Sequence, residues 1–261
     1  MSLIFDSHAH YDSAAFDDDR DTVLASLPAR GVGGVINAGS DLPSSRTSIA
    51  LSEQYPFVWA AVGVHPEAAR EMTSNDLAEI RQLATSSRVV AIGEIGLDYH
   101  YEDACPREIQ QQWFAAQLAL ANKLDLPVIV HDREAHEDTL RLLREYRPKG
   151  VLHCFSGSVE MLREVMHLGM SIGLGGAVTF KNARRPVEAA AAVPADRLLL
   201  ETDAPYMTPV PDRGKRCDSA HIAYTAAKIA EVRGIPVDAL LDLTRENTCR
   251  LFGIALSGKS G

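Results

Sequence analysis

The sequence predicts an α/β fold, a (β/α)8 TIM barrel, and two observations lead to this prediction. Eight short apolar runs recur along the 261 residues, and most are followed by a longer segment with helical spacing of apolar residues. The runs are rich in Val, Ile and Leu with little alternation, which indicates strands buried on both faces, as in a parallel sheet. Eight βα units favour a closed barrel over the runner-up, an open doubly wound sheet.

The eight expected strands share this apolar character. They cover residues 3–5, 32–36, 57–62, 89–92, 127–130, 150–152, 170–172 and 197–200.

Two of the intervening segments have the clearest helical periodicity. The first is 106–124, with Pro106 suited to its first turn. The second is 135–146, whose apolar residues Leu140, Leu143 and Tyr146 share one face. In the first of these helices, Ile109, Trp113, Ala116 and Leu120 share one face.

No linker, repeat or low-complexity block divides the chain, so we expect one barrel domain over residues 1–256 and a flexible tail over 257–261. With 46% hydrophobic and 23% charged residues, the composition is that of a globular protein. The net charge of −9 argues against a broad basic surface for nucleic acid, although not against a local one. No signal peptide or membrane span is expected, and four dispersed cysteines indicate reduced thiols and a cytoplasmic location.

Glu94 poses a physical problem, because it follows an apolar run although a buried, unpaired carboxylate is costly. In a barrel, catalytic residues gather where strands end. Imidazoles and carboxylates follow five of the expected strands, and both are ligands of Mg²⁺, Mn²⁺ or Zn²⁺. We therefore predict a centre of two divalent metal ions. The predicted ligands are His8, His10, Glu94, His131, His153 and Asp203.

Several motifs then carry a family resemblance. "DSHAHYD", "AVGVHPE", "AIGEIGLDYHY", "PVIVHDREAH", "HCFSG" and "LLLETDAPYMTP" occur in this order over nearly the whole chain, which resembles the TatD family of metal-dependent hydrolases and deoxyribonucleases. The resemblance implies a (β/α)8 fold and phosphodiester hydrolysis, commonly of DNA. It also implies two ligand sets. These are His8, His10, Glu94 and Asp203 for one ion, and Glu94, His131 and His153 for the other.

The sequence departs from the family pattern in one place. The family usually follows Gly-Lys-Arg with Asn-Glu-Pro, whereas this chain keeps Arg216 and continues with Cys217, Asp218 and Ser219. The departure concerns substrate handling at the last loop and leaves the predicted metal ligands intact.

The functional hypothesis is a 3'-5' exonuclease-like deoxyribonuclease that cleaves phosphodiesters with a metal-activated water. Asp203 is the predicted general base, and Glu94 is the second predicted catalytic residue. DNA or another phosphodiester is the expected substrate, with no membrane or obligate protein partner. The alternatives are an amidohydrolase for a small amide, lactone or ester, and a non-catalytic metal-binding scaffold. Glu94 counts against the amidohydrolases that use a carboxylated lysine at this position.

Five further residues are candidates for binding substrate, each with a structural alternative. His65 follows the third expected strand and could instead cap its loop; Tyr99 and His100 could be an ordinary loop pair. Glu201 could be an acceptor for a metal ligand or a carboxylate satisfied by backbone amides. Arg216 lies in a loop that, with the "KNARR" segment, places basic residues at the rim, where they suit a phosphate backbone. The alternative for these residues is an ordinary solvated surface charge.

Overall fold

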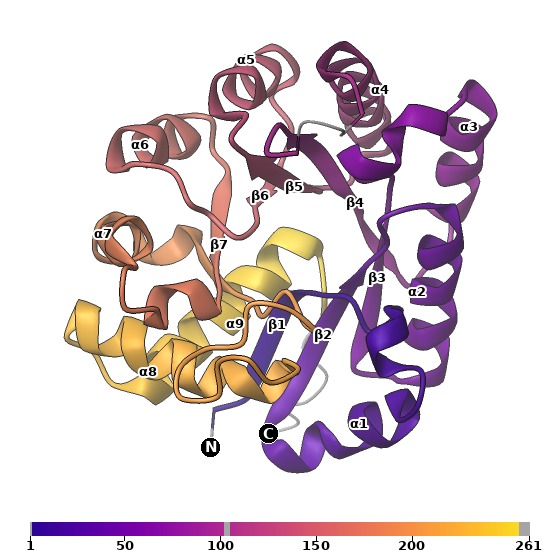
Figure 1. Cartoon of the computed structure of the whole chain (residues 1–261). Coiled ribbons are helices and arrows are strands. Elements are labelled where there is room, and N and C mark those ends of the chain that lie inside the picture. The colour runs from indigo at the N-terminus through magenta and orange to yellow at the C-terminus, as the bar shows by residue number, and fades with distance from the viewer. Residues whose placement is uncertain (1, 102–104, 256–261) are drawn as a thin grey trace.

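The protein is a barrel of eight parallel strands that pair in chain order, β1 to β8 (Figure 1). This computed structural model describes residues 2–101 and 105–255. A parallel bridge between Ala9 and Ala204 joins the last strand region to the first, so the barrel is nearly closed. The strands are β1 (Ile4–Ala9), β2 (Val32–Ala38), β3 (Val58–Val62), β4 (Val89–Asp98), β5 (Val128–Arg133), β6 (Gly150–Leu152), β7 (Ser171–Leu174) and β8 (Leu198–Leu200).

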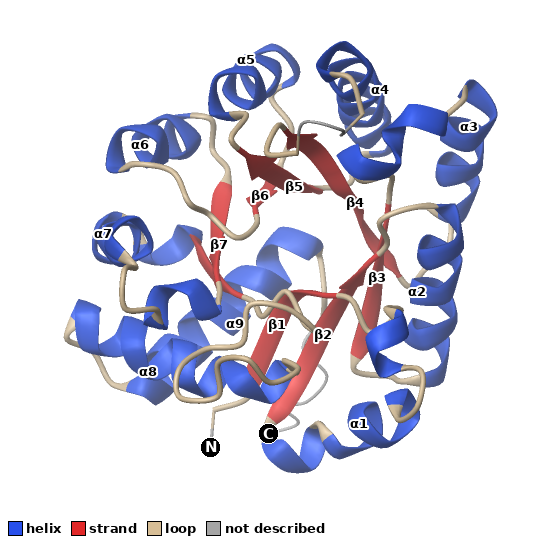
Figure 2. Cartoon of the chain, in the orientation of Figure 1, coloured by secondary structure: helices blue, strands red, loops and turns tan. Residues whose placement is uncertain are grey.

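Helices surround the sheet on its outer side (Figure 2). Polar side chains start several of them: Asp41 and Thr73 form capping boxes, and Ser158 accepts the backbone N–H of Met161. The helices are α1 (Arg20–Ser26), α2 (Leu42–Gln54), α3 (Ser74–Leu83), α4 (Arg107–Leu124), α5 (His136–Tyr146), α6 (Val159–His167), α7 (Arg184–Ala192), α8 (Ile222–Arg233) and α9 (Val237–Phe252).

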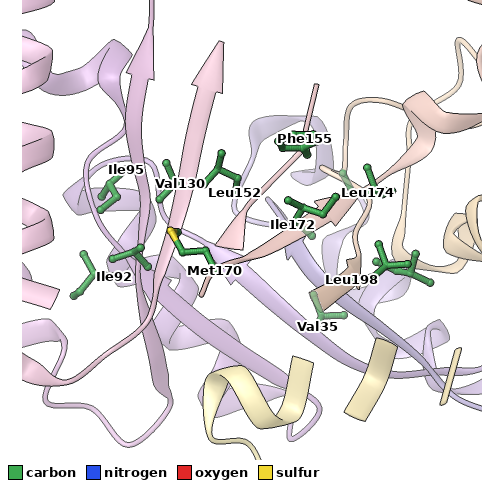
Figure 3. Close-up of a cluster of buried hydrophobic side chains, with 14 of the residues drawn as sticks. Val35, Ile92, Ile95, Val130, Leu152, Phe155, Met170, Ile172, Leu174 and Leu198 are labelled. Atoms are coloured by element: carbon green, nitrogen blue, oxygen red, sulfur yellow. The ribbon is translucent and has the colours of Figure 1, made fainter. Parts of the chain in front are cut away.

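The hydrophobic core has two parts. The larger cluster brings strand residues such as Ile92, Val130 and Ile172 together with residues of the helices (Figure 3). A second cluster joins strand residues such as Ile129 to Phe252 of α9. Since the strands are buried on both faces, they are rigid supports for any side chain at their C-terminal ends.

The prediction of eight strands is confirmed, but the predicted limits of several strands were too short. Strand β4 runs on through Glu94 to Asp98, β1 includes His8, and β5 includes His131. The polar residues marked the predicted ends because a strand buried on both faces seldom carries them. His8, Glu94 and His131 are tolerated within the strands because their polar side chains contact one another, as described below.

The helix predicted at 106–124 is confirmed as α4, but polar side chains are among its most buried residues. Gln110, Phe114 and Gln117 are buried in α4, whereas Trp113 is only half-buried, and Pro106 lies at the N-cap just before the helix. The glutamines can be buried because their side chains form hydrogen bonds with the backbone. Gln117 accepts the N–H of Val64 at 2.8 Å and donates to the Val64 carbonyl at 3.0 Å. Ile109 and Ala116 are also half-buried, and Leu120 is buried.

Within 2–101 and 105–255, no helix is long and apolar enough to cross a membrane. The predicted tail at 257–261 lies outside the described residues, so the division into a domain at 1–256 and a tail stays a prediction.

Candidate metal centre

Glu94 lies at the centre of a cluster of imidazoles and divides it into two sides. Its side chain is 4% exposed, and its two oxygens face different histidines. Oε2 lies 3.3 Å from Nε2 of His8 and 3.4 Å from Nε2 of His10. Oε1 lies 2.8 Å from Nδ1 of His131 and 2.8 Å from Nε2 of His153. A carboxylate in this position can bridge two cations.

Asp203 completes the first side. Its Oδ1 lies 3.6 Å from Nε2 of His8 and 3.4 Å from Nε2 of His10. The two imidazole nitrogens are themselves 3.0 Å apart. Backbone bonds fix the arrangement, because Asp203 N–H donates to the His8 carbonyl at 3.0 Å and His10 N–H donates to the Ala204 carbonyl at 2.7 Å. Four possible ligand atoms therefore lie close together on the first side. They are Nε2 of His8 and His10, Oδ1 of Asp203 and Oε2 of Glu94.

His65 joins the second side, on which His131 and His153 already face Glu94. Its Nε2 lies 3.6 Å from Oε1 of Glu94, and its ring meets the ring of His131 edge-on with centroids 4.4 Å apart. Its Nδ1 accepts the N–H of Glu67, so the same side chain also caps the loop after β3. His65 therefore caps its loop, which was the structural alternative for this residue, and its ring also faces the cluster.

The ring orientations of two histidines are set by contacts behind the cluster. Nδ1 of His10 lies 2.8 Å from the Ala38 carbonyl, so it carries the proton and leaves Nε2 as a lone-pair donor. Nε2 of His131 lies 3.0 Å from Oδ2 of Asp98, which leaves Nδ1 facing Glu94. Such contacts fix the tautomer of a metal-binding histidine. The close approach of β5 to β4 needs Gly96, because a β-carbon there would overlap the His131 carbonyl oxygen.

The pKa values show how the cluster holds its charge. Burial raises the pKa of Glu94, but electrostatic interaction with the imidazoles of His153, His65 and His8 lowers it well below the usual range. Burial also lowers the pKa of His8, to about 4. Burial would lower the pKa of His131 as well, but its bonds to Asp98 and Glu94 raise it to about 10. Protons on some imidazoles therefore neutralise the negative charge of the carboxylates. A divalent cation could take the place of these protons.

Three buried atoms of the site have no hydrogen-bond partner within the described ranges 2–101 and 105–255. They are Nδ1 of His8, Nδ1 of His153 and Oε2 of Glu201. The rings of His8 and His153 stack with centroids 3.9 Å apart, so neither can turn its free nitrogen outward without moving the other. Buried polar atoms normally have partners, and those that lack them mark a functional site or an unfilled ligand position.

The residues present fit the binding of divalent metal ions. Three groups have ligand atoms within 4.8 Å of one another, and their members share Glu94 or His8. The donors are mostly imidazole nitrogens with two carboxylates, a set that suits Zn²⁺ or Mn²⁺ better than Mg²⁺. The groups are His8 with Glu94 and His153, His8 with His10 and Asp203, and His65 with Glu94 and His131.

Glu201 lies beside the second side of the cluster. It is 1% exposed, its Oε1 accepts the backbone N–H of Cys154, and the same oxygen lies 3.8 Å from Nδ1 of His153. Burial raises the pKa of Glu201 to about 8. Gly173 makes room for this carboxylate, because a β-carbon there would overlap Oε2. The carboxylate therefore accepts a backbone N–H, as its structural alternative required, and it also faces His153, a predicted metal ligand.

The other predicted substrate residues have partners away from the cluster. The hydroxyl of Tyr99 donates to Asp138 at 3.0 Å, and Nδ1 of His100 lies 2.7 Å from Oε1 of Glu134. Arg216 forms a two-pronged ion pair with Asp19, at 2.8 and 2.7 Å.

The departure from the family pattern builds part of a contact between the last loop and the N-terminal third of the chain. Asp218 receives bonds from Arg30 at 2.7 and 3.0 Å, and Ser219 N–H donates to the hydroxyl of Tyr11 at 2.8 Å. Cys217 is buried and donates its N–H to the Pro205 carbonyl. Together with the Arg216 pair, we call this set the loop clamp. It comprises Tyr11, Asp19, Arg30, Arg216, Asp218 and Ser219.

Two residues of the site, His65 and Asp98, are not among the predicted ligands, although the sequence holds a signal for each. His65 follows a strand end, as the predicted ligands do, but the sequence prediction places it with the substrate. Asp98 lies four residues after Glu94, and its contact with His131 depends on β4 continuing to Asp98.

A parallel eight-stranded barrel with this cluster at its strand ends is the architecture of a metal-dependent hydrolase acting on ester bonds. A family model described as TatD related DNase matches residues 5–253. The chain therefore belongs to the TatD family, as its motifs indicated.

Individual relatives are similar over their whole length. The uncharacterized metal-dependent hydrolase YabD of Bacillus subtilis is 42% identical over 255 residues, which cover 97% of this chain and 100% of YabD. The 3'-5' ssDNA/RNA exonuclease TatD of Klebsiella pneumoniae is 38% identical, covering 98% of this chain and 100% of that protein. The crystal structure of YJJV, a TatD homolog from Escherichia coli K12, superimposes with a TM-score of 0.91 at 33% identity, covering 97% of this chain and 98% of YJJV.

Proposed function

We propose that this protein is a deoxyribonuclease that removes nucleotides from DNA in the 3'-5' direction with the help of two divalent metal ions. The observation that carries the proposal is the division of the Glu94 carboxylate, with one oxygen facing His8 and His10 and the other facing His131 and His153. Two-metal sites with a shared carboxylate suit in-line displacement at phosphorus. The name of the Klebsiella relative supports the substrate and the polarity.

His8, His10, Glu94 and Asp203 would hold one ion, and Glu94, His131 and His153 would hold the other, with His65 beside the second. When bound, such ions would lower the pKa of a coordinated water and neutralise charge on the phosphodiester. The choice among Mg²⁺, Mn²⁺ and Zn²⁺ follows from the donors, and the imidazoles favour the latter two.

Asp203 is the proposed general base. Its side chain is 20% exposed, whereas that of Glu94 is 4% exposed, so Asp203 is the carboxylate that an attacking water can reach. Burial raises the pKa of Asp203, but hydrogen bonding and charge from His10 lower it below its usual range, so the carboxylate is ionised at neutral pH. It can therefore accept the proton that the water loses on attack. Its φ of 63° is uncommon for a residue other than glycine, and such conformations cluster at active sites.

The decisive experiment uses single-stranded DNA labelled at either end, with protein reconstituted in Mg²⁺, Mn²⁺ or Zn²⁺. Labelled mononucleotide should appear at once from the 3'-labelled strand, while the 5'-labelled strand should shorten gradually, and a chelator should stop both. The Asp203→Asn variant should lose about 100-fold to 10,000-fold in kcat, the usual effect of removing a general base. No nucleotide release with any of the three metals would refute the proposal.

The same assay separates the two alternatives. Turnover confined to amide, lactone or carboxylic ester substrates would favour the amidohydrolase alternative. Metal binding without turnover of any substrate would favour a scaffold. The presence of Glu94, not a lysine, at the bridging position supports the nuclease over the lysine-bridged amidohydrolases.

A further inference from the structure

The loops after β7 and β8 are joined into one surface beside the metal centre. The N–H of Val210 donates to Oγ1 of Thr179 at 2.9 Å, and the guanidinium of Arg213 lies 3.6 Å from the ring centroid of Phe180. Gly176 lies so close to the second loop that a β-carbon would overlap the Met207 carbonyl oxygen. The helices that follow these loops, α7 and α8, lie side by side (Figure 1). We call residues 176–185 and 203–213 the loop platform.

The loop platform carries exposed positive charges. Residues 176–185 contain three cations and no acid. Arg184 pairs with Glu188 at 2.9 Å, but Lys181, Arg185 and Arg213 have no carboxylate within ion-pair distance in the part of the chain that the structure describes. All three are exposed. On a chain of net charge −9, these three cations lie on the two joined loops and the first turn of α7, and they make this part of the rim attractive to a polyanion.

The loop platform also presents an exposed aromatic ring next to the metal centre. Tyr206 is 60% exposed and lies three residues after Asp203. Its backbone is held firmly, because its N–H donates to the Asp203 carbonyl at 2.8 Å and the preceding Pro205 carbonyl accepts the N–H of Cys217 at 3.0 Å. The structure thus holds an aromatic side chain on a fixed backbone while leaving its face open to solvent.

We propose that a single strand of nucleic acid lies on the loop platform, with an unpaired base stacked on Tyr206 and its phosphates beside Lys181, Arg185 and Arg213. Proteins that bind single strands combine aromatic side chains, on which any base can stack, with cations that follow the backbone. A base paired in a duplex has no free face for the ring, so the surface selects single strands without reading sequence. This proposal rests on the proposed nuclease function.

The charge component is tested by binding without turnover. Fluorescence anisotropy of a labelled single-stranded oligonucleotide is measured with a chelator present, over a range of salt concentrations. The triple variant Lys181→Gln, Arg185→Gln and Arg213→Gln should reduce the slope of log affinity against log salt by about 2, because each phosphate contact on a single strand contributes about 0.7. The matched control is the triple variant Arg81→Gln, Lys123→Gln and Arg147→Gln, which removes the same number of charges at the C-terminal ends of α3, α4 and α5.

The stacking component is tested with Tyr206→Ala and Tyr206→Phe. The alanine variant should bind the strand roughly tenfold more weakly, whereas the phenylalanine variant keeps the ring and should bind like the wild type. Removing the 3'-terminal base from the oligonucleotide should weaken binding to the wild type and have little effect on Tyr206→Ala. If Phe and Ala are equally defective, or if Tyr206→Ala still discriminates the missing base, the stacking role is refuted.

The outcomes separate the two proposals. If the wild type releases no nucleotides from DNA, the nuclease function fails. If it does release them but the loop-platform triple variant has the salt slope of its control, the function stands and the loop platform is refuted. Equal competition by an acidic polypeptide would also refute it, because the surface would then be a general anion site.

Discussion

Two polar clusters link the start of the barrel to its last loop, but they differ in how their groups are satisfied. In the loop clamp, unlike charges meet: Arg30 pairs with Asp218 at 2.7 Å, and Arg216 pairs with Asp19 at the same distance. In the metal centre, five imidazoles surround two carboxylates, and ring nitrogens of His8 and His153 have no partner within the described residues.

This difference distinguishes a structural cluster from a functional one. A polar cluster whose donors and acceptors match is complete and stabilises the fold. A cluster in which imidazole nitrogens face one another is satisfied only when a proton or a metal ion binds between them. Removing a residue from the metal centre should therefore affect metal binding and turnover, and removing one from the loop clamp should affect stability.

The largest expected effect is that of Glu94→Gln. The amide keeps the shape of the side chain but removes the charge that both sides of the centre share. We expect kcat on a phosphodiester substrate to fall about 1,000-fold, the upper end of the loss caused by removing one interaction with developing charge at a catalytic site. Metal content by elemental analysis should fall with it, while circular dichroism shows a folded barrel.

The control for Glu94→Gln is Glu231→Gln, which changes an exposed residue of α8 that pairs with Lys228. It should leave turnover unchanged. Wild-type turnover by Glu94→Gln at saturating metal would show that the shared carboxylate is dispensable.

The next effect concerns Asp98, which reaches the metal centre only through His131. Asp98→Asn keeps the size of the side chain but weakens its hold on the ring. Changes of this kind typically cost 10-fold to 100-fold in metal affinity. Competition with a coloured chelator measures the affinity directly. Asp138→Asn, which changes the partner of the Tyr99 hydroxyl, should bind metal like the wild type. Equal affinities for the two variants would rule out the role of Asp98.

The same contrast explains what could be predicted from the sequence. The residues that lie together around Glu94 could be selected from the sequence because a histidine or carboxylate at the end of an apolar run is unusual, as at His8, Glu94 and His131. The barrel was recognisable for the same reason, since its strands are almost uniformly apolar. Both predictions depend on residues next to each other in the chain.

Contacts between individual residues of distant segments, away from the strand ends where a barrel brings residues together, could not be predicted. Gln117 looks like a surface residue, and only the approach of Val64, 53 residues earlier, makes it a buried one. Asp218 and Ser219 looked like a change at the substrate mouth, but their partners lie at Arg30 and Tyr11, which no local pattern indicates.

Within the loop clamp, Tyr11→Phe should have the larger effect. The hydroxyl is buried, lies 2.8 Å from Oγ of Ser219 and accepts the Ser219 N–H, so its removal leaves two buried groups without their partner. An unsatisfied buried donor costs about 1–3 kcal/mol, and we expect a loss of about 2 kcal/mol in the free energy of unfolding. Urea denaturation measures it. Tyr55→Phe, which removes a more exposed hydroxyl bonded to Asp21, should cost less. An unchanged urea midpoint for Tyr11→Phe would mean that water satisfies Ser219 equally well.

The smallest effect is expected for Asp218→Asn, and it should depend on pH. Burial raises the pKa of Asp218, but hydrogen bonds from His221 and Arg30 lower it from 3.8 to about 2. Because the folded-state pKa is below the unfolded one, the carboxylate stabilises the fold at pH values above 3.8, and this contribution is lost as the pH falls towards 2. The shift corresponds to about 2 kcal/mol, which solvent around the half-exposed Arg30 reduces to about 1 kcal/mol. Urea unfolding should therefore show Asp218→Asn to be less stable than the wild type at pH 7 and equal to it near pH 2. A difference that persists unchanged at both pH values would assign the contribution of Asp218 to packing, not to charge.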